Sequence, residues 1–338
     1  MSRLGLAVIG TGPGSIPHFK SLRNLVDWVD VRWVAARRTE SLTAFGEYAT
    51  TTDVAAAIAD PTVGAVLVLT PPSSHLAIAR LAFAGGKHVL VEKPLEVSIG
   101  AARALVTEGR AAGVRVGVVL QQRFRDASVA MRDLLASVRL GDIQAASVQI
   151  PWWRPQAYYD ETGRGTVARD GGGVLLTQAI HTLNFFQHLV GVRRVVAAQV
   201  RTTTLHRMET EDYAGALLET ANGAPATLIA TTASFPGRPE SIEIIGSLGT
   251  ARLEGASLRA RFLDGGSFEH ISTEGTGGGA SIMDFPHDAH RAVLADFVAA
   301  IAEGRDPAVT GEDALATQEL INTIIAAGGR GTDNTERR

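Results

Sequence analysis

The sequence contains no cysteine among its 338 residues, which excludes disulfide bonds, thiolate metal sites and cysteine nucleophiles. It also lacks an apolar run long enough to span a bilayer. Basic residues form no block, and the net charge is −3, so the charge pattern favours neither a nucleic-acid groove nor an anionic membrane surface. We therefore expect no nucleic-acid partner and no membrane partner.

Residues 1–6 lack the apolar region and cleavage site of a signal peptide and lead directly into a strand-like pattern. A cytoplasmic protein is therefore expected. The remaining composition, 45% hydrophobic and 20% charged residues, is that of an ordinary globular protein. The length suits two domains better than one.

The first third of the chain alternates short apolar runs with amphipathic segments. The strand-like runs lie at 4–9, 31–36, 65–69, 88–91 and 114–119. The helix-like segments lie at 16–25, 53–58, 74–84 and 98–112. Continuous apolar strands that alternate with helices predict a doubly wound parallel α/β sheet, and we place this domain at 1–123.

The rest of the chain, 124–330, predicts an α+β domain with one mostly antiparallel sheet and helices on one of its faces. Its strand-like segments lie near 143–150, 195–204, 213–219, 226–234, 241–245 and 250–253. Its helix-like segments lie at 127–138, 174–190, 290–303 and 312–327. We expect a flexible loop at 275–279 and a disordered tail at 331–338.

A glycine-rich turn, Gly10-Thr11-Gly12-Pro13-Gly14-Ser15, follows the first strand and opens the first helix. In such turns the first glycine permits the tight bend and the second lets the backbone approach a pyrophosphate. The third position needs only a small residue, and Ser15 stands there. The helix N-terminus then favours the anion, so the pattern predicts a dinucleotide-binding Rossmann domain.

The second strand is followed by Arg37 and Arg38, where an acid normally binds the adenosine ribose. Arginine grips phosphate groups bidentately, so this pair predicts a preference for NADP, with NAD possible. The alternative is a solvated pair at the start of a helix.

The run Val89-Leu90-Val91-Glu92-Lys93-Pro94 is a short apolar strand that ends in an acid, a base and a proline. Proline disfavours helical geometry in the residue before it, so Lys93 is expected to be extended at the carboxyl end of the strand. Ligands bind at these ends in open α/β sheets. Lys93 is therefore a candidate proton carrier, phosphate contact or Schiff-base amine, or else a solvated lysine.

Three further blocks complete a pattern with the glycine turn. They are Thr70-Pro71-Pro72-Ser73-Ser74-His75, Glu92-Lys93-Pro94, and Gly171-Gly172-Gly173 followed by His181. In this order and spacing they resemble the Gfo/Idh/MocA family of sugar and inositol oxidoreductases, over nearly the whole chain. The resemblance implies a Rossmann domain and a second domain whose open-faced antiparallel sheet packs against another subunit. It thus implies a homodimer or homotetramer formed through the C-terminal sheet.

The resemblance also implies a set of cofactor contacts beyond the glycine turn. They are Thr70, Pro71, Pro72, His75, Glu92, Lys93, Gln122 and Arg123. On the substrate side it points to the loop from 152 to 170 and to the helix of His181. The candidate substrate contacts are Trp153, Arg154, Tyr158, Arg164, Arg169, Thr177, Gln178 and Asn184. Aromatic faces stack on sugar rings and arginines bind acid groups, although an interface or salt-bridged loop would use the same residues.

Hydride transfer from a carbinol to a nicotinamide requires removal of the hydroxyl proton, and the protein supplies that step. Either Lys93 or His181 is able to take it. By resemblance both lie at the reacting carbon, and we assign His181 as the acid/base and Lys93 as the group that orients the oxygen. Many members carry Asp where this chain has Thr177 and Asn184.

Three functions therefore stay open. The first is an oxidoreductase of a sugar, inositol or related polyol. The second is a dehydrogenase of a non-sugar substrate such as an aromatic cis-dihydrodiol, and the third is a cofactor-binding sensor without turnover. His287 and His290 share a helical face with Asp284 nearby, but no third ligand is identifiable, so we predict no metal.

Overall fold

The computed structural model describes residues 3–272 and 286–329, which divide into two compact units. Unit 1 comprises Met1–Gln121 and His287–Ala316, and unit 2 comprises Gln122–Pro286 and Thr317–Arg338. The loop expected at 275–279, the tail expected at 331–338 and Asp284 lie outside the described residues.

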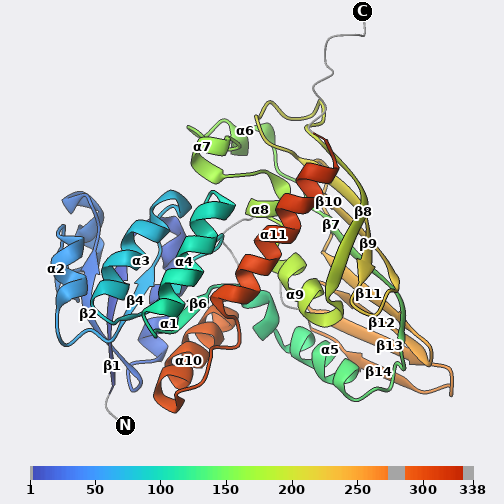
Figure 1. Cartoon of the computed structure of the whole chain (residues 1–338), viewed down its shortest axis with the longest axis horizontal. Helices are drawn as coiled ribbons and strands as arrows, with labels where there is room; N and C mark the ends of the chain where they lie inside the picture. The colour runs from blue at the N-terminus through green and yellow to red at the C-terminus, as the bar shows by residue number, and fades with distance from the viewer. Residues whose placement is uncertain (1–2, 273–285, 330–338) are drawn as a thin grey trace, which may run out of the picture. The chain divides into compact units, whose positions relative to one another are not determined.

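Unit 1 is built on a parallel sheet of six strands in the order β3-β2-β1-β4-β5-β6 (Figure 1). The strands are β1 (Leu4–Ile9), β2 (Val29–Ala35), β3 (Thr50–Thr51), β4 (Ala65–Val68), β5 (His88–Val91) and β6 (Val116–Val118). The predicted doubly wound sheet is confirmed. The strand order reverses between β1 and β4, which is where such sheets bind ligands.

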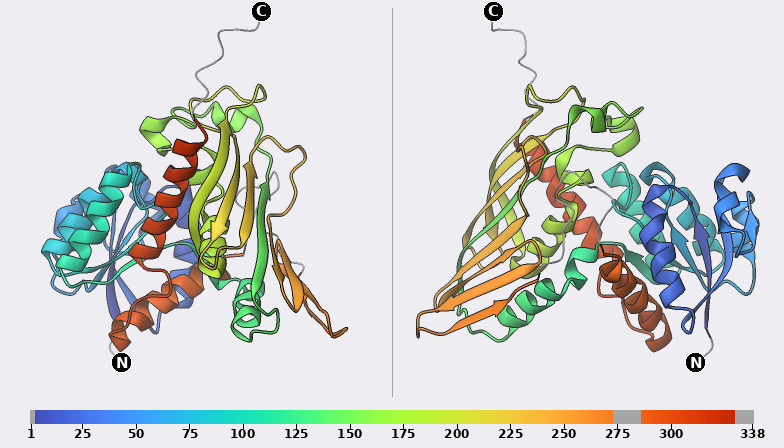
Figure 2. Two further views of the ribbon diagram at one scale, coloured as in Figure 1. Left: turned by 45° about the vertical axis from the view of Figure 1, so that its right-hand side comes forward. Right: turned by 180° about the vertical axis from the view of Figure 1, so that it is seen from behind.

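The helices of unit 1 form two groups. They are α1 (Ile16–Asn24), α2 (Val54–Ala59), α3 (His75–Ala84), α4 (Ile99–Ala111) and α10 (Asp288–Glu303). α2, α3 and α4 pack in a row, whereas α1 packs against α10 (Figure 2). Side chains start two of the helices, because Asp53 accepts a hydrogen bond from the backbone of α2 and Ser98 from that of α4.

The domain boundary predicted from sequence put residues 290–303 in the second domain, but in the structure α10 lies in unit 1. α10 belongs to unit 1 because its apolar face packs there. Gly117 of β6 has no side chain, and a Cβ at that position would lie 2.9 Å from the ring of Phe297. The next helix, α11 (Gly311–Ala327), begins in unit 1 and ends in unit 2.

Unit 2 contains an eight-stranded sheet in the order β14-β13-β12-β11-β7-β10-β9-β8. Its strands are β7 (Ile143–Pro151), β8 (Val192–Arg201), β9 (Tyr213–Thr220), β10 (Pro225–Thr231), β11 (Ser241–Gly246), β12 (Gly249–Glu254), β13 (Ser257–Phe262) and β14 (Ser267–His270). Among the described residues of this sheet, only β7 and β10 pair in parallel, and the other neighbouring strands are antiparallel. The predicted, mostly antiparallel sheet is confirmed, and β13 and β14 extend it beyond the prediction.

Helices of unit 2 pack on the sheet. α5 (Asp126–Ala136) contacts β12 and β13, α8 (Val174–Thr177) contacts β9 and β10, and α9 (Ile180–Val190) contacts β7. The sequence predicted one helix over 174–190, but the structure divides it at 178–179. In the described part of the chain, no helix combines the length and apolar character that crossing a bilayer requires.

Gly10 offers a direct test of the turn after β1. Its φ is +110°, and an added Cβ would lie 2.7 Å from the carbonyl carbon of Leu69. We expect Gly10→Ala to lower the free energy of unfolding by about 1–3 kcal/mol, because both backbone strain and the clash oppose folding. Urea denaturation followed by circular dichroism measures this change.

Gly12→Ala is the matched control. Gly12 has φ −68°, which alanine adopts readily, and an added Cβ there would meet no atom within 4 Å. Its free energy of unfolding should stay within about 0.5 kcal/mol of the unmodified protein. Equal losses in the two variants would contradict the strained turn at Gly10.

Candidate active site

Four neighbouring strands of unit 1 end in register. Ile9 of β1 pairs with Ala35 of β2 on one side and with Val68 of β4 on the other, and Val68 pairs with Val91 of β5. Because the strands are parallel, the segments that follow them emerge at one edge of the sheet. These segments carry Gly10, Arg37, Arg38, Thr70, Glu92 and Lys93.

The glycine turn at this edge leaves room beside its backbone. The Gly10 N–H donates to the Ala35 carbonyl at 2.8 Å, which holds the turn against β2. Added Cβ atoms at Gly12 and Gly14 would meet no atom within 4 Å, so packing does not require these two glycines. Ser15 is 2% exposed, as expected for a small residue packed between helix and strand. The turn therefore fits the close approach of a pyrophosphate.

Arg37 and Arg38 are both exposed in the segment that follows β2. In the described parts of the chain, neither guanidinium forms an ion pair. Arg38 is the residue before the short helix η2 (Thr39–Phe45). Two adjacent cationic groups without an acidic partner are able to bind a phosphate group bidentately.

His75 has a different position from the one predicted. The side chain is completely buried, and Nε2 lies 2.8 Å from the Thr70 carbonyl oxygen, while Nδ1 lies 3.1 Å from the carbonyl oxygens of Pro94 and Leu95. Burial lowers the pKa of His75, and these hydrogen bonds to backbone carbonyls oppose that effect. His75 thus joins the Thr70 loop to the segment after Lys93.

Thr70, Pro71 and Pro72 form the loop after β4. The Thr70 hydroxyl oxygen accepts a hydrogen bond of 2.8 Å from Ser74, in the short helix η3 (Pro72–Ser74) that precedes α3. This bond closes the loop on itself at the carboxyl edge of the sheet.

Both carboxylate oxygens of Glu92 have partners within unit 1. Oε1 lies 2.7 Å from Nε2 of His18, and Oε2 accepts the backbone N–H of Lys93 at 3.0 Å. Burial favours the neutral acid, but the hydrogen bond from His18 and the nearby charges of His18, Lys93 and His290 outweigh it and lower the pKa of Glu92 to about 2. Glu92 was predicted beside the cofactor ribose, and the structure shows that it holds the Lys93 backbone.

In unit 2, the last residue of the triple glycine, Gly173, has a steric cause. A Cβ at Gly173 would lie 1.9 Å from the backbone oxygen of Glu211. The Glu211 carboxylate accepts the N–H groups of Gly173 at 3.0 Å and Leu175 at 3.2 Å, at the start of α8. Glu211 was not predicted as a functional residue. The backbone groups that it binds lie 36 to 38 residues away, and no local sequence pattern indicates this contact. His181 follows as the second residue of α9.

Thr177 does not lie on the same helix as His181, because the helix breaks at 178–179, whereas Asn184 follows His181 by three residues in α9. The Thr177 hydroxyl donates to the Gly173 carbonyl at 2.7 Å. Asn184 is 1% exposed, accepts from Nε of Arg123 at 2.7 Å and donates to Thr317 at 2.9 Å. Asn184 is therefore buried and hydrogen-bonded within unit 2.

Gln122 and Arg123, predicted near the nicotinamide, lie in the short helix η4 (Gln121–Phe124) and are 3% and 8% exposed. The Nε of Arg123 donates to Asn184, so part of its hydrogen-bonding capacity is used within unit 2.

The structure brings four predicted substrate residues of unit 2 together. Arg154 donates to Gln178 at 3.0 Å, and Gln178 donates to the hydroxyl of Tyr158 at 2.9 Å. The guanidinium of Arg164 lies over the Tyr158 ring, 4.1 Å from its centroid. Burial lowers the pKa of Arg154. The result is a connected polar and aromatic cluster.

Arg164, Arg169 and Trp153 also have partners within the same loop region or nearby in unit 2. Arg164 and Arg169 both form ion pairs with Glu161, which supports the salt-bridged interpretation of this part of the loop. Trp153 meets Phe235 edge to face, with ring centroids 5.5 Å apart.

A buried pair, His206 and Asp212, supports the cluster. His206 Nδ1 lies 2.7 Å from Asp212, and its Nε2 lies 2.8 Å from the carbonyl oxygen of Arg154. Both side chains are 0% exposed, so this pair fixes the Arg154 backbone.

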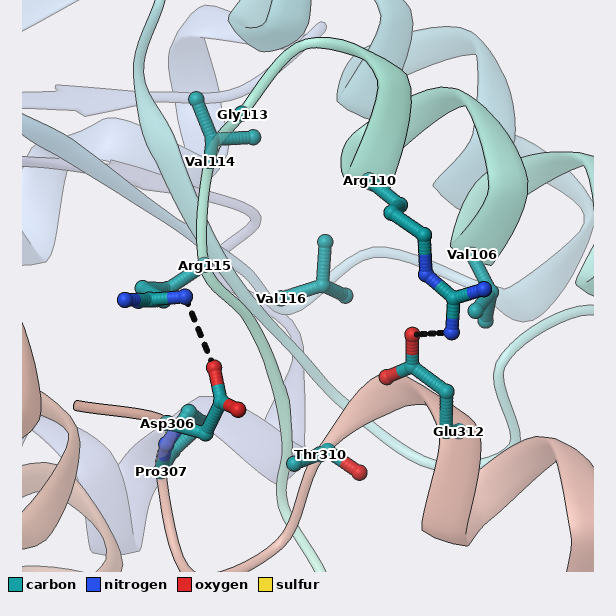
Figure 3. Close-up of a pocket in the computed structure, with 10 residues that line it drawn as sticks. All are labelled: Val106, Arg110, Gly113, Val114, Arg115, Val116, Asp306, Pro307, Thr310 and Glu312. Carbon is teal, nitrogen blue, oxygen red and sulfur yellow. Dashed lines mark hydrogen bonds and ion pairs between the residues drawn. The ribbon is translucent and has the colours of Figure 1, made fainter.

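A cavity of about 460 Å³ lies elsewhere in unit 1, at the amino end of β6 (Figure 3). Two ion pairs border it, Arg115–Asp306 at 2.8 Å and Arg110–Glu312 at 2.6 Å. None of the predicted site residues lines it. It is at the opposite end of the strands from the glycine turn, so it is not the candidate active site.

Curated relatives of this chain are oxidoreductases. The chain is 28% identical to an uncharacterized oxidoreductase from Synechocystis over 76% of this chain and 73% of the relative. It is 25% identical to trans-1,2-dihydrobenzene-1,2-diol dehydrogenase from Mus musculus over 58% of this chain and 56% of that enzyme. It is 34% identical to inositol 2-dehydrogenase from Streptomyces avermitilis over 41% of this chain and 42% of that enzyme.

Solved structures share the fold. The WlbA dehydrogenase from Bordetella pertussis, in complex with NADH and UDP-GlcNAcA, has a TM-score of 0.81 at 24% identity, covering 97% of each chain. A levoglucosan dehydrogenase in complex with NADH and L-sorbose has a TM-score of 0.85 at 20% identity, also covering 97% of each chain.

Family matches cover both units. Residues 4–120 match the oxidoreductase family with an NAD-binding Rossmann fold, and residues 128–252 match the GFO/IDH/MocA C-terminal domain. The chain therefore belongs to the Gfo/Idh/MocA family and is an NAD(P)-dependent oxidoreductase.

Proposed function

We propose that this enzyme transfers a hydride between a nicotinamide and a carbinol or ketone of a sugar, inositol or related polyol, with NADP as the preferred cofactor. The observation that carries the proposal is the register of unit 1, which aligns the glycine turn, the Thr70 loop and Lys93 at one edge of the sheet. When bound, the nicotinamide supplies the hydride chemistry. The protein positions the reactants and handles the proton.

Two side chains are proposed to handle the hydroxyl proton of the substrate and the charge on its oxygen. His181 is the proposed acid/base, since a histidine changes charge near neutral pH. Lys93 is proposed to orient the substrate oxygen and to stabilise charge that develops on it during hydride transfer. Its backbone is fixed by Glu92, which favours a defined position for the ammonium group.

The substrate class rests on the cluster of Arg154, Tyr158 and Gln178, which combines an aromatic face with hydrogen-bonding groups suited to a polyhydroxylated ring. The names of an inositol dehydrogenase and of sugar-binding neighbours point the same way. A second candidate is a dihydrodiol, because several curated relatives are trans-1,2-dihydrobenzene-1,2-diol dehydrogenases. Nicotinamide absorbance, followed over a panel of sugars, inositols and dihydrodiols, distinguishes the two.

We also propose that the enzyme is a homodimer or homotetramer assembled through the sheet of unit 2. One face of this sheet is exposed and carries apolar side chains. Leu217 of β9 is 54% exposed and Ile229 of β10 is 41% exposed, and the pairings of these strands put both on that face. Exposed apolar side chains on one face of a sheet favour a protein–protein contact.

Lys93→Ala should reduce turnover by at least about 100-fold, because the substrate oxygen loses its cationic partner. Binding of NADPH should stay within a few-fold, since the glycine turn and Thr70 loop are unchanged. Stopped-flow absorbance and a fluorescence titration measure the two quantities. Turnover at the unmodified rate would refute the role of Lys93 on any substrate that the panel identifies.

Arg37→Ala combined with Arg38→Ala should weaken NADPH binding by about 10- to 100-fold, because a 2′-phosphate loses charge-assisted hydrogen bonds. Affinity for NADH, which has no 2′-phosphate, should change by less than about threefold. Titration of both cofactors by nicotinamide fluorescence provides the comparison. If the unmodified enzyme binds NADH more tightly than NADPH, the proposed preference is wrong.

Leu217→Glu combined with Ile229→Glu should convert the oligomer to monomers, since buried carboxylates oppose the contact. Light scattering coupled to size-exclusion chromatography measures the mass. Leu263→Glu is the control, because Leu263 is 79% exposed in the turn between β13 and β14 and lies outside the strands. A monomeric unmodified protein, or an oligomer that survives the double substitution, would count against the sheet interface.

A further inference from the structure

Three side chains from distant parts of the sequence meet beside the Lys93 turn. His18 comes from α1, Glu92 follows β5, and His290 comes from α10. One donor atom of each lies within 4.8 Å of the others. The two imidazoles are 1% and 5% exposed, and their rings meet edge to face with centroids 5.2 Å apart. All three belong to unit 1.

Two histidines and a carboxylate are also a metal donor set, and distances decide between a metal site and a hydrogen-bonded network. Ligands on a tetrahedral zinc ion, with bonds of ~2.0–2.1 Å, stand about 3.3 Å apart. The His18–Glu92 contact is 2.7 Å, which is the length of a strong hydrogen bond and too short for two ligands of one ion. The second oxygen of Glu92 already accepts the Lys93 N–H. The geometry therefore favours a network.

The direction of the network follows from the charge of its centre. Glu92 is ionised at neutral pH, so it accepts and His18 Nε2 carries the donated proton. His18 Nδ1 is buried and has no hydrogen-bond partner among the described residues. The Nε2–H of His18 is therefore the donor of this hydrogen bond.

We propose that His18 and His290 are positioning residues for Lys93, an inference that rests on the proposed role of Lys93 in turnover. His18 orients the Glu92 carboxylate, Glu92 holds the Lys93 backbone N–H, and the His290 ring limits the rotation of His18. His75 holds the other side of the turn through the carbonyls of Pro94 and Leu95. The Lys93 backbone is thus fixed from both sides.

Such fixation matters because a displacement of a catalytic group by about 1 Å costs up to about 100-fold in rate. The charged and titratable groups that face Glu92 are His18 from α1, His290 from α10 and the adjacent Lys93. The return of α10 to unit 1 therefore supplies part of the support for the turn.

The test compares His18→Leu, which removes the donor, with His18→Gln, whose amide N–H reaches about as far as Nε2. We expect His18→Leu to lower kcat by about 10- to 100-fold while the Kd for NADPH stays within about threefold. His18→Gln should retain kcat within about fivefold. His290→Ala should lower kcat by about 3- to 10-fold, and His287→Ala, which removes a bond to Asn24 outside the network, should leave it unchanged.

If the substitutions changed stability alone, His18→Leu and His18→Gln would have the same kcat at saturating substrate. Equal loss in both variants, or an unchanged kcat in His18→Leu, would overturn the positioning role. If Lys93→Ala keeps turnover, the proposed role of Lys93 fails instead, so the two failures are distinguishable.

Nitrogen-15 NMR of the unmodified protein supplies a second measurement that does not depend on any variant folding. Nε2 of His18 should carry the proton that is donated to Glu92. An Nε2 without a proton, or tight binding of added Zn²⁺ that is lost in His290→Ala, would contradict the network.

Discussion

The register of the parallel strands in unit 1 is the constraint on which the candidate site depends. Ile9, Val68 and Val91 pair in one row, and each is 0 or 1% exposed. A shift of one residue in any strand would turn buried apolar side chains to the other face and move the following loop along the edge of the sheet. Burial of apolar strands thus aligns the polar loops that follow them.

Fold elements with a strong local signal were predictable from sequence. β1 and β5 begin and end at the predicted residues, because strands buried on both faces are short apolar runs bounded by turn residues. The break between α8 and α9 was not predictable. The side chains around it form a continuous apolar helical pattern, and the break is accompanied by contacts with Glu211, which lies far along the chain. The return of α10 to unit 1 was not predictable either, because it also depends on contacts between residues far apart along the chain.

The site shows the same division. Chain order was sufficient to predict which loops gather at the sheet edge, since parallel strands fix that outcome. The order of the elements along the chain did not predict which partners the individual side chains contact. Both ring nitrogens of His75 lie close to backbone carbonyl oxygens, and both oxygens of Glu92 contact His18 and Lys93. Both residues support the turn around Lys93, and that role follows from contacts 19 to 74 residues apart.

Thr177 and Asn184 bear on how the proton is handled. Neither side chain is able to accept a proton as a carboxylate does. The Thr177 hydroxyl is engaged with the Gly173 carbonyl, and the Asn184 amide is engaged with Arg123 and Thr317. In the proposed mechanism, proton handling then rests on Lys93 and His181 without help from a carboxylate at 177 or 184. The proposed chemistry therefore depends more heavily on the position of Lys93, whose backbone N–H donates to Glu92.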